Sequence, residues 1–271
     1  RPFGEMQFSL FQKIVNEVVR ESPTTRMWLA IMGEPLLLKE RLLEMIVYAK
    51  KQGITELNLN TNAVYLDEGM AKALIESGID KVLVSIDATT KGTYDKIRVG
   101  GNFKRVVENL ERILELKKST GAQKPELIAQ FIVMEENEHE LKAFKSYWLE
   151  RGAVVKVRPK LGWGSAVTSS ALDQAAAVTE RFPCSWLTRT VSIHWDGSFS
   201  QCDADHEGTY SPGNLDTQSI AEVWRGEIAR RRKRHWNLDF DFEPCKGCKD
   251  WLAGRSTFYH PESSIKARDD L

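Results

Sequence analysis

The sequence lacks the features that would assign it at once to several common classes of protein. It has no excess of either charge, with 38 lysine and arginine residues against 38 aspartate and glutamate residues. A protein that binds a phosphate backbone usually carries a basic excess. No apolar run approaches the roughly 18 residues of a membrane span, and no secretory leader is evident. These absences argue against nucleic-acid and membrane partners and favour a cytoplasmic location.

Cysteine is absent from the first 183 residues. The four cysteines all fall in the last third of the chain, at Cys184, Cys202, Cys245 and Cys248. Two disulfides would require an oxidising compartment, which nothing else in the sequence indicates. A cysteine cluster in a cytosolic chain more often binds metal. We therefore expect a metal site, with two disulfides as the alternative.

Residues 1–160 alternate between strand and helix patterns. Apolar strands are expected at 27–32, 56–60, 81–86, 127–134 and 154–157, and amphipathic helices at 5–21, 36–51, 67–77, 103–114 and 138–151. Such alternation with short connections predicts an α/β fold of parallel βαβ units. The 271 residues, 42% of them apolar, suffice for one sizeable core and an appendage.

The composition changes after residue 160. Small residues make 161–180 a predicted linker, and 181–255 form a predicted cysteine domain that is followed by a tail, 256–271. Within that domain, segments 191–194 and 198–201 flank Trp195-Asp196-Gly197, which is typical of a hairpin. A helix is expected over 219–236. Its basic run, 230–234, is interpreted as a solvated face, with binding of an acidic partner as the alternative.

Polar residues lie where the first three strands end. These segments are Gly33-Glu34-Pro35, Asn60-Thr61-Asn62-Ala63 and Ser85-Ile86-Asp87, and Tyr94, Arg98, Gly101 and Phe103 follow the last of them. Barrel enzymes place their chemistry at the carboxyl ends of the strands. Each residue alone is equally typical of a turn or helix cap. Only the joint pattern indicates a site.

That joint pattern resembles the radical S-adenosylmethionine (SAM) superfamily, in the right order and over nearly the whole chain. The resemblance implies that Gly33 and Glu34 hold the methionyl ammonium of SAM, that Asn62 belongs to a Thr-Asn-Gly-like motif, and that Ser85 and Arg98 bind the carboxylate. A zwitterionic amino acid needs acceptors at one end and a charged donor at the other. The implied fold is a partial (β/α)6 TIM-like barrel, with five of its six strands in this sequence.

One feature of the family is missing. Its catalytic [4Fe–4S] cluster is bound by a Cys-x3-Cys-x2-Cys loop after the first strand, and neither that loop nor a sixth strand is present. Arg1–Met6 resembles the segment that follows the loop in relatives. We expect the loop to lie upstream of Arg1, outside this sequence, and a degenerate homologue without the cluster is the alternative. The printed polypeptide could not by itself cleave SAM, so its catalytic residues stay unassigned.

The cysteines have a specific setting. Four thiolates suit either zinc or an iron–sulfur cluster by geometry, and the five histidines show no metal spacing. Asp196-Gly197, Gly213-Asn214-Leu215, Ser219–Trp224 and the closing Cys245-Lys246-Gly247-Cys248 resemble the SPASM/Twitch extension of the superfamily. Full SPASM domains have about seven cysteines, whereas the Twitch version has about four and one auxiliary cluster. We therefore expect one auxiliary [4Fe–4S] cluster on Cys184, Cys202, Cys245 and Cys248.

The resemblance implies an enzyme that makes a 5′-deoxyadenosyl radical from SAM and abstracts hydrogen from its substrate. Its electrons would come from a flavodoxin- or ferredoxin-type reductant. We expect dehydrogenation of a small molecule with the auxiliary cluster as electron acceptor, because four cysteines can fill all four iron positions. A peptide-modifying maturase and a non-catalytic binding protein are the alternatives.

Overall fold

The computed structural model describes residues 3–30, 32–253, 256–261 and 266–268. They divide into two compact units. The sheet unit contains the described residues of 18–158 and 256–268, and the cysteine unit contains 3–17 and 159–253. The predicted domains, 1–160, 161–180, 181–255 and 256–271, follow the order of the sequence. The compact units, by contrast, each draw on segments from both ends of the chain.

The sheet unit is built on one sheet whose first five strands stand in sequence order. These strands are β1 (Arg26–Trp28), β2 (Glu56–Thr61), β3 (Lys81–Ser85), β4 (Glu126–Val133) and β5 (Val154–Pro159). Strands β1 to β4 pair in parallel, as the alternating pattern predicted. β1 is shorter than the predicted strand 27–32, of which residue 31 lies outside the described part of the chain.

The sheet continues beyond β5 with two strands from the tail that the sequence did not indicate. β8 (Thr257–Tyr259) pairs antiparallel with β5, and β9 (Lys266–Arg268) pairs antiparallel with β8. Phe258 of β8 packs on an apolar cluster of Leu83, Ile128 and Val154. Phe258 is only partly buried, so it gains part of the roughly 1.5–3 kcal/mol that full burial of a large apolar side chain contributes. Residues 257–259 are therefore anchored on the core of the sheet unit.

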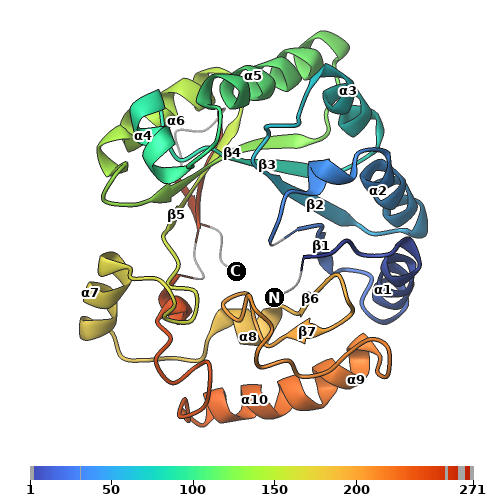
Figure 1. Ribbon diagram of the computed structural model, residues 1–271, viewed down its shortest axis with the longest axis vertical. Coiled ribbons are helices and arrows are strands. Elements are labelled where there is room, and N and C mark those ends of the chain that lie inside the picture. Colours follow the sequence, from blue (N-terminus) through green and yellow to red (C-terminus); the bar gives the residue numbers. More distant parts are fainter. Residues whose placement is uncertain (1–2, 31, 254–255, 262–265, 269–271) are drawn as a thin grey trace. The chain divides into compact units, whose positions relative to one another are not determined.

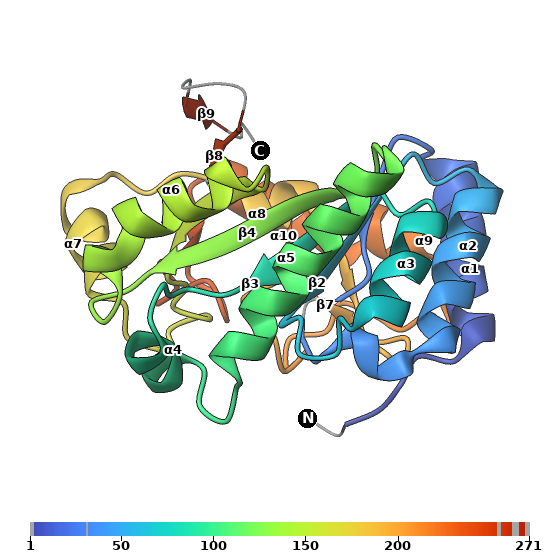
Figure 2. The same ribbon diagram turned by 90° about the horizontal axis from the view of Figure 1, so that it is seen from above.

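Helices cover one face of the sheet in Figures 1 and 2. They are α2 (Glu40–Gln52), α3 (Glu68–Glu76), α5 (Phe103–Thr120) and α6 (Leu141–Glu150), close to the predicted ranges. The caps of α5 explain its bounds: Asn102 accepts a hydrogen bond from the Arg105 amide, and Gly121 ends the helix at φ +68°. A shorter helix, α4 (Lys91–Ile97), was not predicted and carries Arg98 at its end.

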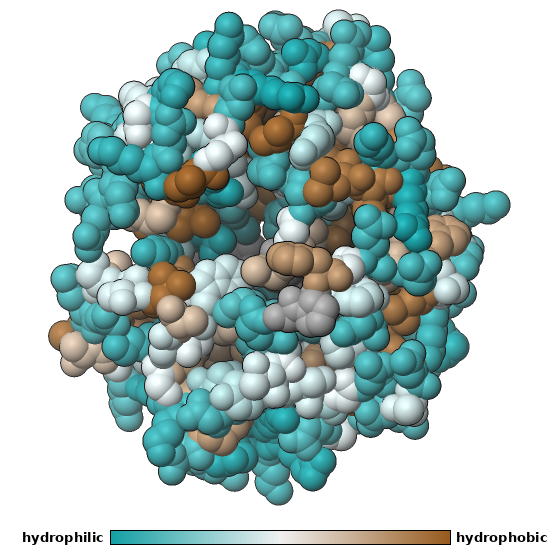
Figure 3. Space-filling model, viewed as in Figure 1, coloured by the Kyte–Doolittle hydropathy of each residue, from teal (hydrophilic) through white to brown (hydrophobic). Residues whose placement is uncertain are grey.

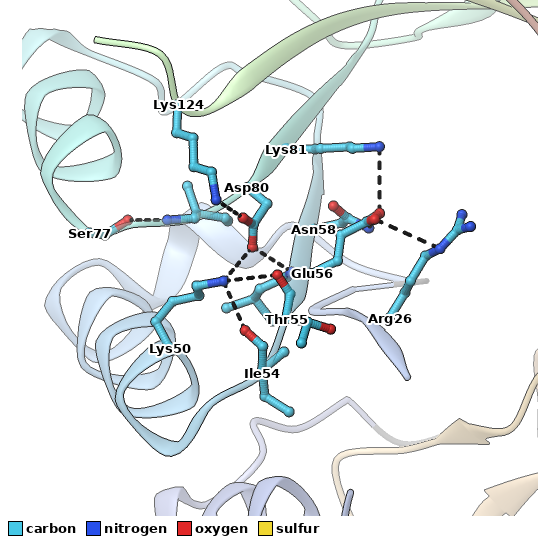
Figure 4. Close-up of polar contacts among 12 residues, drawn as sticks. Arg26, Lys50, Ile54, Thr55, Glu56, Asn58, Ser77, Asp80, Lys81 and Lys124 are labelled. Atoms are coloured by element: carbon cyan, nitrogen blue, oxygen red, sulfur yellow. Dashed lines mark hydrogen bonds and ion pairs between the residues drawn. The ribbon is translucent and has the colours of Figure 1, made fainter. Parts of the chain in front are cut away.

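Ion pairs connect the residues at the amino-terminal ends of the strands (Figure 4). Asp80 precedes β3 and accepts hydrogen bonds from Lys50 Nζ at 2.6 Å and the Leu57 amide at 2.8 Å, while Lys124 Nζ contacts its other oxygen. Burial opposes ionisation of this carboxyl, but these donors outweigh it and lower the pKa of Asp80. The contacts at the amino-terminal ends of the strands therefore stabilise the sheet unit. The polar residues singled out above lie at the opposite, carboxyl-terminal ends of the strands.

The cysteine unit contains short elements. Its hairpin pairs β6 (Ser192–Ile193) with β7 (Phe199–Ser200), as predicted. Its helices include α1 (Phe8–Glu21) in part, α7 (Ser170–Val178), α8 (Ser185–Arg189), α9 (Ile220–Arg225) and α10 (Glu227–Trp236), and a short 3-10 turn occurs at Asp250–Leu252. The 3-10 turns at Pro35–Leu38 and Glu138–Glu140 belong to the sheet unit. The predicted helix over 219–236 is broken at Gly226, and α7 forms inside the predicted linker because alanines favour helix.

The basic run on α10 is not a uniformly solvated face. Arg231 is mostly buried and bonds Glu227 and Gln201, and Arg232 lies 3.9 Å from the ring of Trp224. Of residues 230–233, only Arg230 and Lys233 are exposed to solvent. The interpretation as a solvated face is therefore wrong for Arg231 and Arg232, which fix α10 to its surroundings.

The surface shown in Figure 3 is largely hydrophilic, and apolar residues form small separate patches on it. Across the described ranges, no helix has the length and apolar character that a membrane-spanning segment requires.

Candidate cofactor and cluster sites

Glu34 joins the end of β1 to the end of β2. One carboxylate oxygen accepts hydrogen bonds from the Leu36 amide at 3.0 Å and from Thr61 Oγ1 at 2.7 Å. The other accepts one from the Asn62 amide at 2.7 Å. Each carboxylate oxygen has two lone pairs, so the second oxygen can still accept a bond from a ligand ammonium. Gly33, which precedes Glu34, has φ +85°, a left-handed backbone conformation that glycine adopts readily.

The turn after β2 is held in an unusual backbone conformation. Asn62 Oδ1 accepts a hydrogen bond from the Val64 amide, and the next residue, Ala63, has φ +58°. This left-handed region is disfavoured for alanine. Asn109 of α5 stabilises the turn by donating to the Ala63 carbonyl at 2.7 Å. The chain thus holds Asn62 beside Glu34 at a cost in strain, and strain of this kind is typical of functional sites.

Ser85 ends β3, and Arg98, at the end of α4, reaches back to Asp87 just beyond that strand. Arg98 donates through Nε at 3.1 Å and through a terminal nitrogen to Asp87 Oδ2, which engages two of its five N–H groups. Its other N–H groups are suited to a second carboxylate. Ser85 Oγ accepts a hydrogen bond from Gln130 on β4 at 3.2 Å. Its own hydroxyl hydrogen can therefore be donated to a ligand.

Asp87 is itself rigidly held. It is 1% exposed, has φ +63°, and its second oxygen accepts from the Ile132 amide at 2.7 Å. Asn137 donates to its carbonyl at 2.8 Å. A buried carboxylate anchored in this way fixes the position of the Arg98 guanidinium. Asp87 is a positioning residue that the sequence placed in the motif without assigning it a role.

The structure brings the predicted SAM residues to neighbouring strand ends. Thr61 pairs with Val84, so the turn containing Asn62 lies next to the strand that ends at Ser85. Acceptor groups gather at Glu34, and a cationic donor lies at Arg98. A zwitterionic amino acid requires this arrangement of charges, and the residues therefore fit the methionyl part of SAM.

The four cysteines line one cavity in the cysteine unit. All are free thiols, so the alternative of two disulfides is wrong for this structure. Burial raises the pKa of Cys245 to about 11 and that of Cys248 to about 12, and it also raises the pKa values of Cys184 and Cys202. The cavity therefore favours thiolates only when a cationic group binds them.

His235 and Gln201 contact Cys245, and neither was predicted. Both are fully buried. His235 Nε2 lies 3.3 Å and Gln201 Nε2 lies 3.2 Å from the Cys245 sulfur. Burial, with help from the charges of Arg181 and Arg234, lowers the pKa of His235 to about 4 and keeps its ring neutral. Residue spacing did not indicate this histidine, because its contact with Cys245 depends on how α10 and the cysteine loop pack together.

Two further side chains that line the same cavity carry N–H groups, and these groups, unlike those of His235 and Gln201, have no partner among the described residues. Within the described part of the chain, Arg181 Nε and Trp186 Nε1 are buried and have no hydrogen-bond acceptor. Buried N–H groups are rarely left without acceptors. The bridging sulfides of an iron–sulfur cluster are acceptors, whereas a zinc ion offers none. The donors therefore fit a cluster better than zinc.

No three His, Cys, Asp or Glu side chains converge on a single metal position anywhere in the described ranges. Asp250, which is buried, links the cysteine loop to residues 162–164 by accepting from the Gly162 and Gly164 amides at 2.5 and 2.8 Å. These hydrogen bonds hold the cysteine loop in place beside the cavity, which is also lined by the four cysteines and the N–H donors described above.

Comparison with known proteins identifies the families of two parts of the chain. A sequence model of the radical SAM superfamily matches residues 2–145, and one of an iron–sulfur cluster-binding domain, SPASM, matches residues 184–249. A tungsten-containing aldehyde ferredoxin oxidoreductase cofactor-modifying protein of Pyrococcus furiosus is 23% identical over 265 residues, which cover 83% of this chain and 74% of that protein. A probable GTP 3′,8-cyclase of Methanococcus maripaludis is 32% identical over 125 residues, 46% of this chain but only 39% of the cyclase.

Solved structures share the fold. BtrN in complex with AdoMet and 2-DOIA has a TM-score of 0.59 at 17% identity, covering 92% of this chain and 82% of BtrN. Streptococcus suis SuiB bound to the precursor peptide SuiA has a TM-score of 0.66 at 11% identity, covering 92% of this chain and 64% of SuiB. These matches confirm the predicted α/β fold with a partial barrel and a cysteine module.

Proposed function

This chain belongs to the radical SAM superfamily and carries a SPASM domain, and we propose that it dehydrogenates a small organic substrate. Its cofactors are SAM and iron–sulfur clusters. When bound, SAM and the clusters supply a hydrogen-abstracting radical and a one-electron acceptor, so that the substrate loses a hydrogen atom, a proton and an electron. The proposal includes an external one-electron carrier of flavodoxin or ferredoxin type.

The residues of the sheet unit would bind and orient the amino-acid part of SAM. Glu34 accepts a hydrogen bond from its ammonium, with Gly33 and Asn62 forming the surrounding turn. Arg98 pairs with its carboxylate while Asp87 holds the guanidinium in place. Ser85 donates its hydroxyl hydrogen to the same carboxylate. Charge-assisted bonds at both ends fix the cofactor in one orientation.

One observation carries the dehydrogenase proposal: all four cysteines line the same cavity. Four thiolates can ligate all four irons of a [4Fe–4S] cluster, which leaves no iron position for the substrate. A cluster with all its positions filled is suited to electron transfer rather than to binding substrate. Cys184, Cys202, Cys245 and Cys248 would therefore hold an auxiliary electron acceptor.

The test uses the enzyme in a form that includes the Cys-x3-Cys-x2-Cys loop, with Cys245 and Cys248 both replaced by alanine. We expect this variant to convert SAM to 5′-deoxyadenosine in anaerobic turnover with dithionite, but to release no oxidised product. Liquid chromatography counts both compounds. Product formed at the wild-type ratio to 5′-deoxyadenosine would overturn the proposal. Loss of SAM cleavage in a folded variant would instead assign the module to substrate docking.

A peptide substrate is the second candidate. Proteins of this fold have been solved with peptides, namely SuiB with the precursor peptide SuiA and anSMEcpe with the Kp18Cys peptide. The two candidates differ in their products. A mass spectrum of anaerobic turnover mixtures would show either a small molecule or a peptide that has lost two hydrogens.

A further inference from the structure

The cysteine cavity is lined by four side-chain N–H groups from different parts of the cysteine unit. Two of them, on Gln201 and His235, point at the sulfur of Cys245. The other two, on Arg181 and Trp186, are buried without an acceptor among the described residues. All four side chains are lining residues of this cavity.

The proton on His235 is placed by the backbone. The amide N–H of Cys184 donates to His235 Nδ1 at 3.2 Å, so Nδ1 must act as an acceptor. In a neutral imidazole the proton then lies on Nε2, the nitrogen that faces Cys245 at 3.3 Å. The contact is therefore an N–H···S hydrogen bond, and its direction follows from the geometry.

The orientation of Gln201 is fixed in a similar way. Its carbonyl oxygen accepts a hydrogen bond from Arg231 at 2.5 Å, because a guanidinium can only donate. The amide nitrogen must then face Cys245, 3.2 Å away. Cys245 thus accepts two N–H donors whose orientations are set by other contacts in the fold.

Arg181 contributes a charge as well as a donor. Its terminal nitrogens bond the Cys245 carbonyl at 2.6 Å and the Lys246 carbonyl at 3.4 Å, which holds its guanidinium against the cysteine loop. Its Nε, like Trp186 Nε1, is buried and has no acceptor among the residues that the structure describes. Buried donors that lack partners in a cavity lined by thiols indicate acceptor atoms on the group that binds there.

We propose that Arg181, Trp186, Gln201 and His235 act together to raise the reduction potential of the auxiliary cluster. Reduction adds negative charge to the cluster and its thiolates, and N–H donors and a nearby cation stabilise that charge. The reduced form is therefore favoured. This inference rests on the proposed binding of a cluster here, and it explains why this module would take up an electron.

The experiment measures the midpoint potential of the cluster in this 271-residue chain after anaerobic reconstitution with iron and sulfide. The four cysteines are the only ones in the sequence, so no other cysteine-ligated cluster interferes. Trp186→Phe and His235→Phe each remove an N–H donor. Trp224→Phe and His206→Phe make the same changes in the same unit at residues that do not line the cavity.

We expect Trp186→Phe and His235→Phe to shift the midpoint potential to more negative values, and the controls to leave it unchanged. A tenfold weaker preference for the reduced form corresponds to about 59 mV for one electron. Pulsed electron paramagnetic resonance of the reduced cluster should show that each variant has lost one exchangeable-proton coupling. A merely structural role would not remove such a coupling.

Intact clusters with wild-type potentials and couplings in both variants would overturn the inference. If either variant fails to hold the cluster, Gln201→Met provides an independent measurement on the same sulfur. If the wild-type chain binds zinc and no sulfide, the proposed function itself fails, and that outcome is distinct from an unchanged potential.

Discussion

Glu140 offers the sharpest test of how the site-bearing loop after β3 is held. The side chain is 6% exposed and lies just before α6. Its carboxylate accepts hydrogen bonds from the amides of Thr89 and Thr90 and from the hydroxyls of Thr89, Thr90 and Thr93. It therefore fixes the start of α4, the helix that leads to Arg98. Glu140→Gln replaces one acceptor oxygen with a donor facing those same donors.

The magnitude follows from the pKa of Glu140. Burial would raise it, but the threonine donors outweigh burial and lower it from 4.5 to about 2. At about 1.4 kcal/mol for each pH unit between these values, the ionised carboxylate contributes about 3 kcal/mol at pH 7. The pKa is lower in the folded state, so this stabilisation is complete above pH 4.5 and is lost as the pH falls towards 2. By pH 3, about 2 kcal/mol of it should be gone.

The assay is urea unfolding followed by far-UV circular dichroism at pH 7, 5, 4 and 3. Glu140→Gln should be about 3 kcal/mol less stable than the wild type at pH 7, and the difference should shrink at pH 3. Glu138→Gln is the matched control, because Glu138 is exposed on the same turn. The difference between variant and wild type isolates Glu140 from other carboxylates. A difference that stays constant from pH 7 to pH 3 would refute the reasoning.

Three further outcomes follow from the structure. Arg98→Lys and Glu34→Gln should each weaken SAM binding by about 1.5–3 kcal/mol in calorimetric titration of the cluster-loaded enzyme, and unchanged affinity in both would show that the motif is misassigned. Cys245→Ala should lose about four irons per chain in iron and sulfide analysis, whereas retained iron would exclude Cys245 as a ligand. Asp80→Asn should lower the free energy of unfolding by about 1–3 kcal/mol while SAM affinity stays unchanged, and a loss of affinity would contradict a purely stabilising role.

Periodicity predicted the parallel sheet because strands such as β3 and β4 are largely apolar and the covering helices are amphipathic. The position of strand ends drew attention to the polar residues there, because active sites of barrel enzymes lie at the carboxyl ends of the strands. Their assignment to SAM came from the resemblance to the superfamily. The roles of Asp87 and Glu140 could not be predicted in this way. They depend on contacts between residues 11 and about 50 positions apart, which no local pattern records.

The tail and the linker were harder to predict for a different reason. Residues 257–259 form only a three-residue strand, too short for an alternating pattern, and the strand exists because Phe258 packs on the core of the sheet unit. The alanines of α7 were interpreted as part of a linker, although their high helix propensity favours a helix once its ends are held. In both cases, tertiary context decided the structure.

The two candidate sites are prepared for their ligands to different degrees. Glu34 and Arg98 already bond to their own chain, so the SAM site is largely formed before the cofactor binds. The cysteine cavity contains two buried donors without acceptors among the described residues, and leaving them so costs free energy when the cavity binds nothing. Bound sulfide would remove this cost by supplying acceptors. The stability of the cysteine unit, unlike that of the sheet unit, should therefore depend strongly on its iron content.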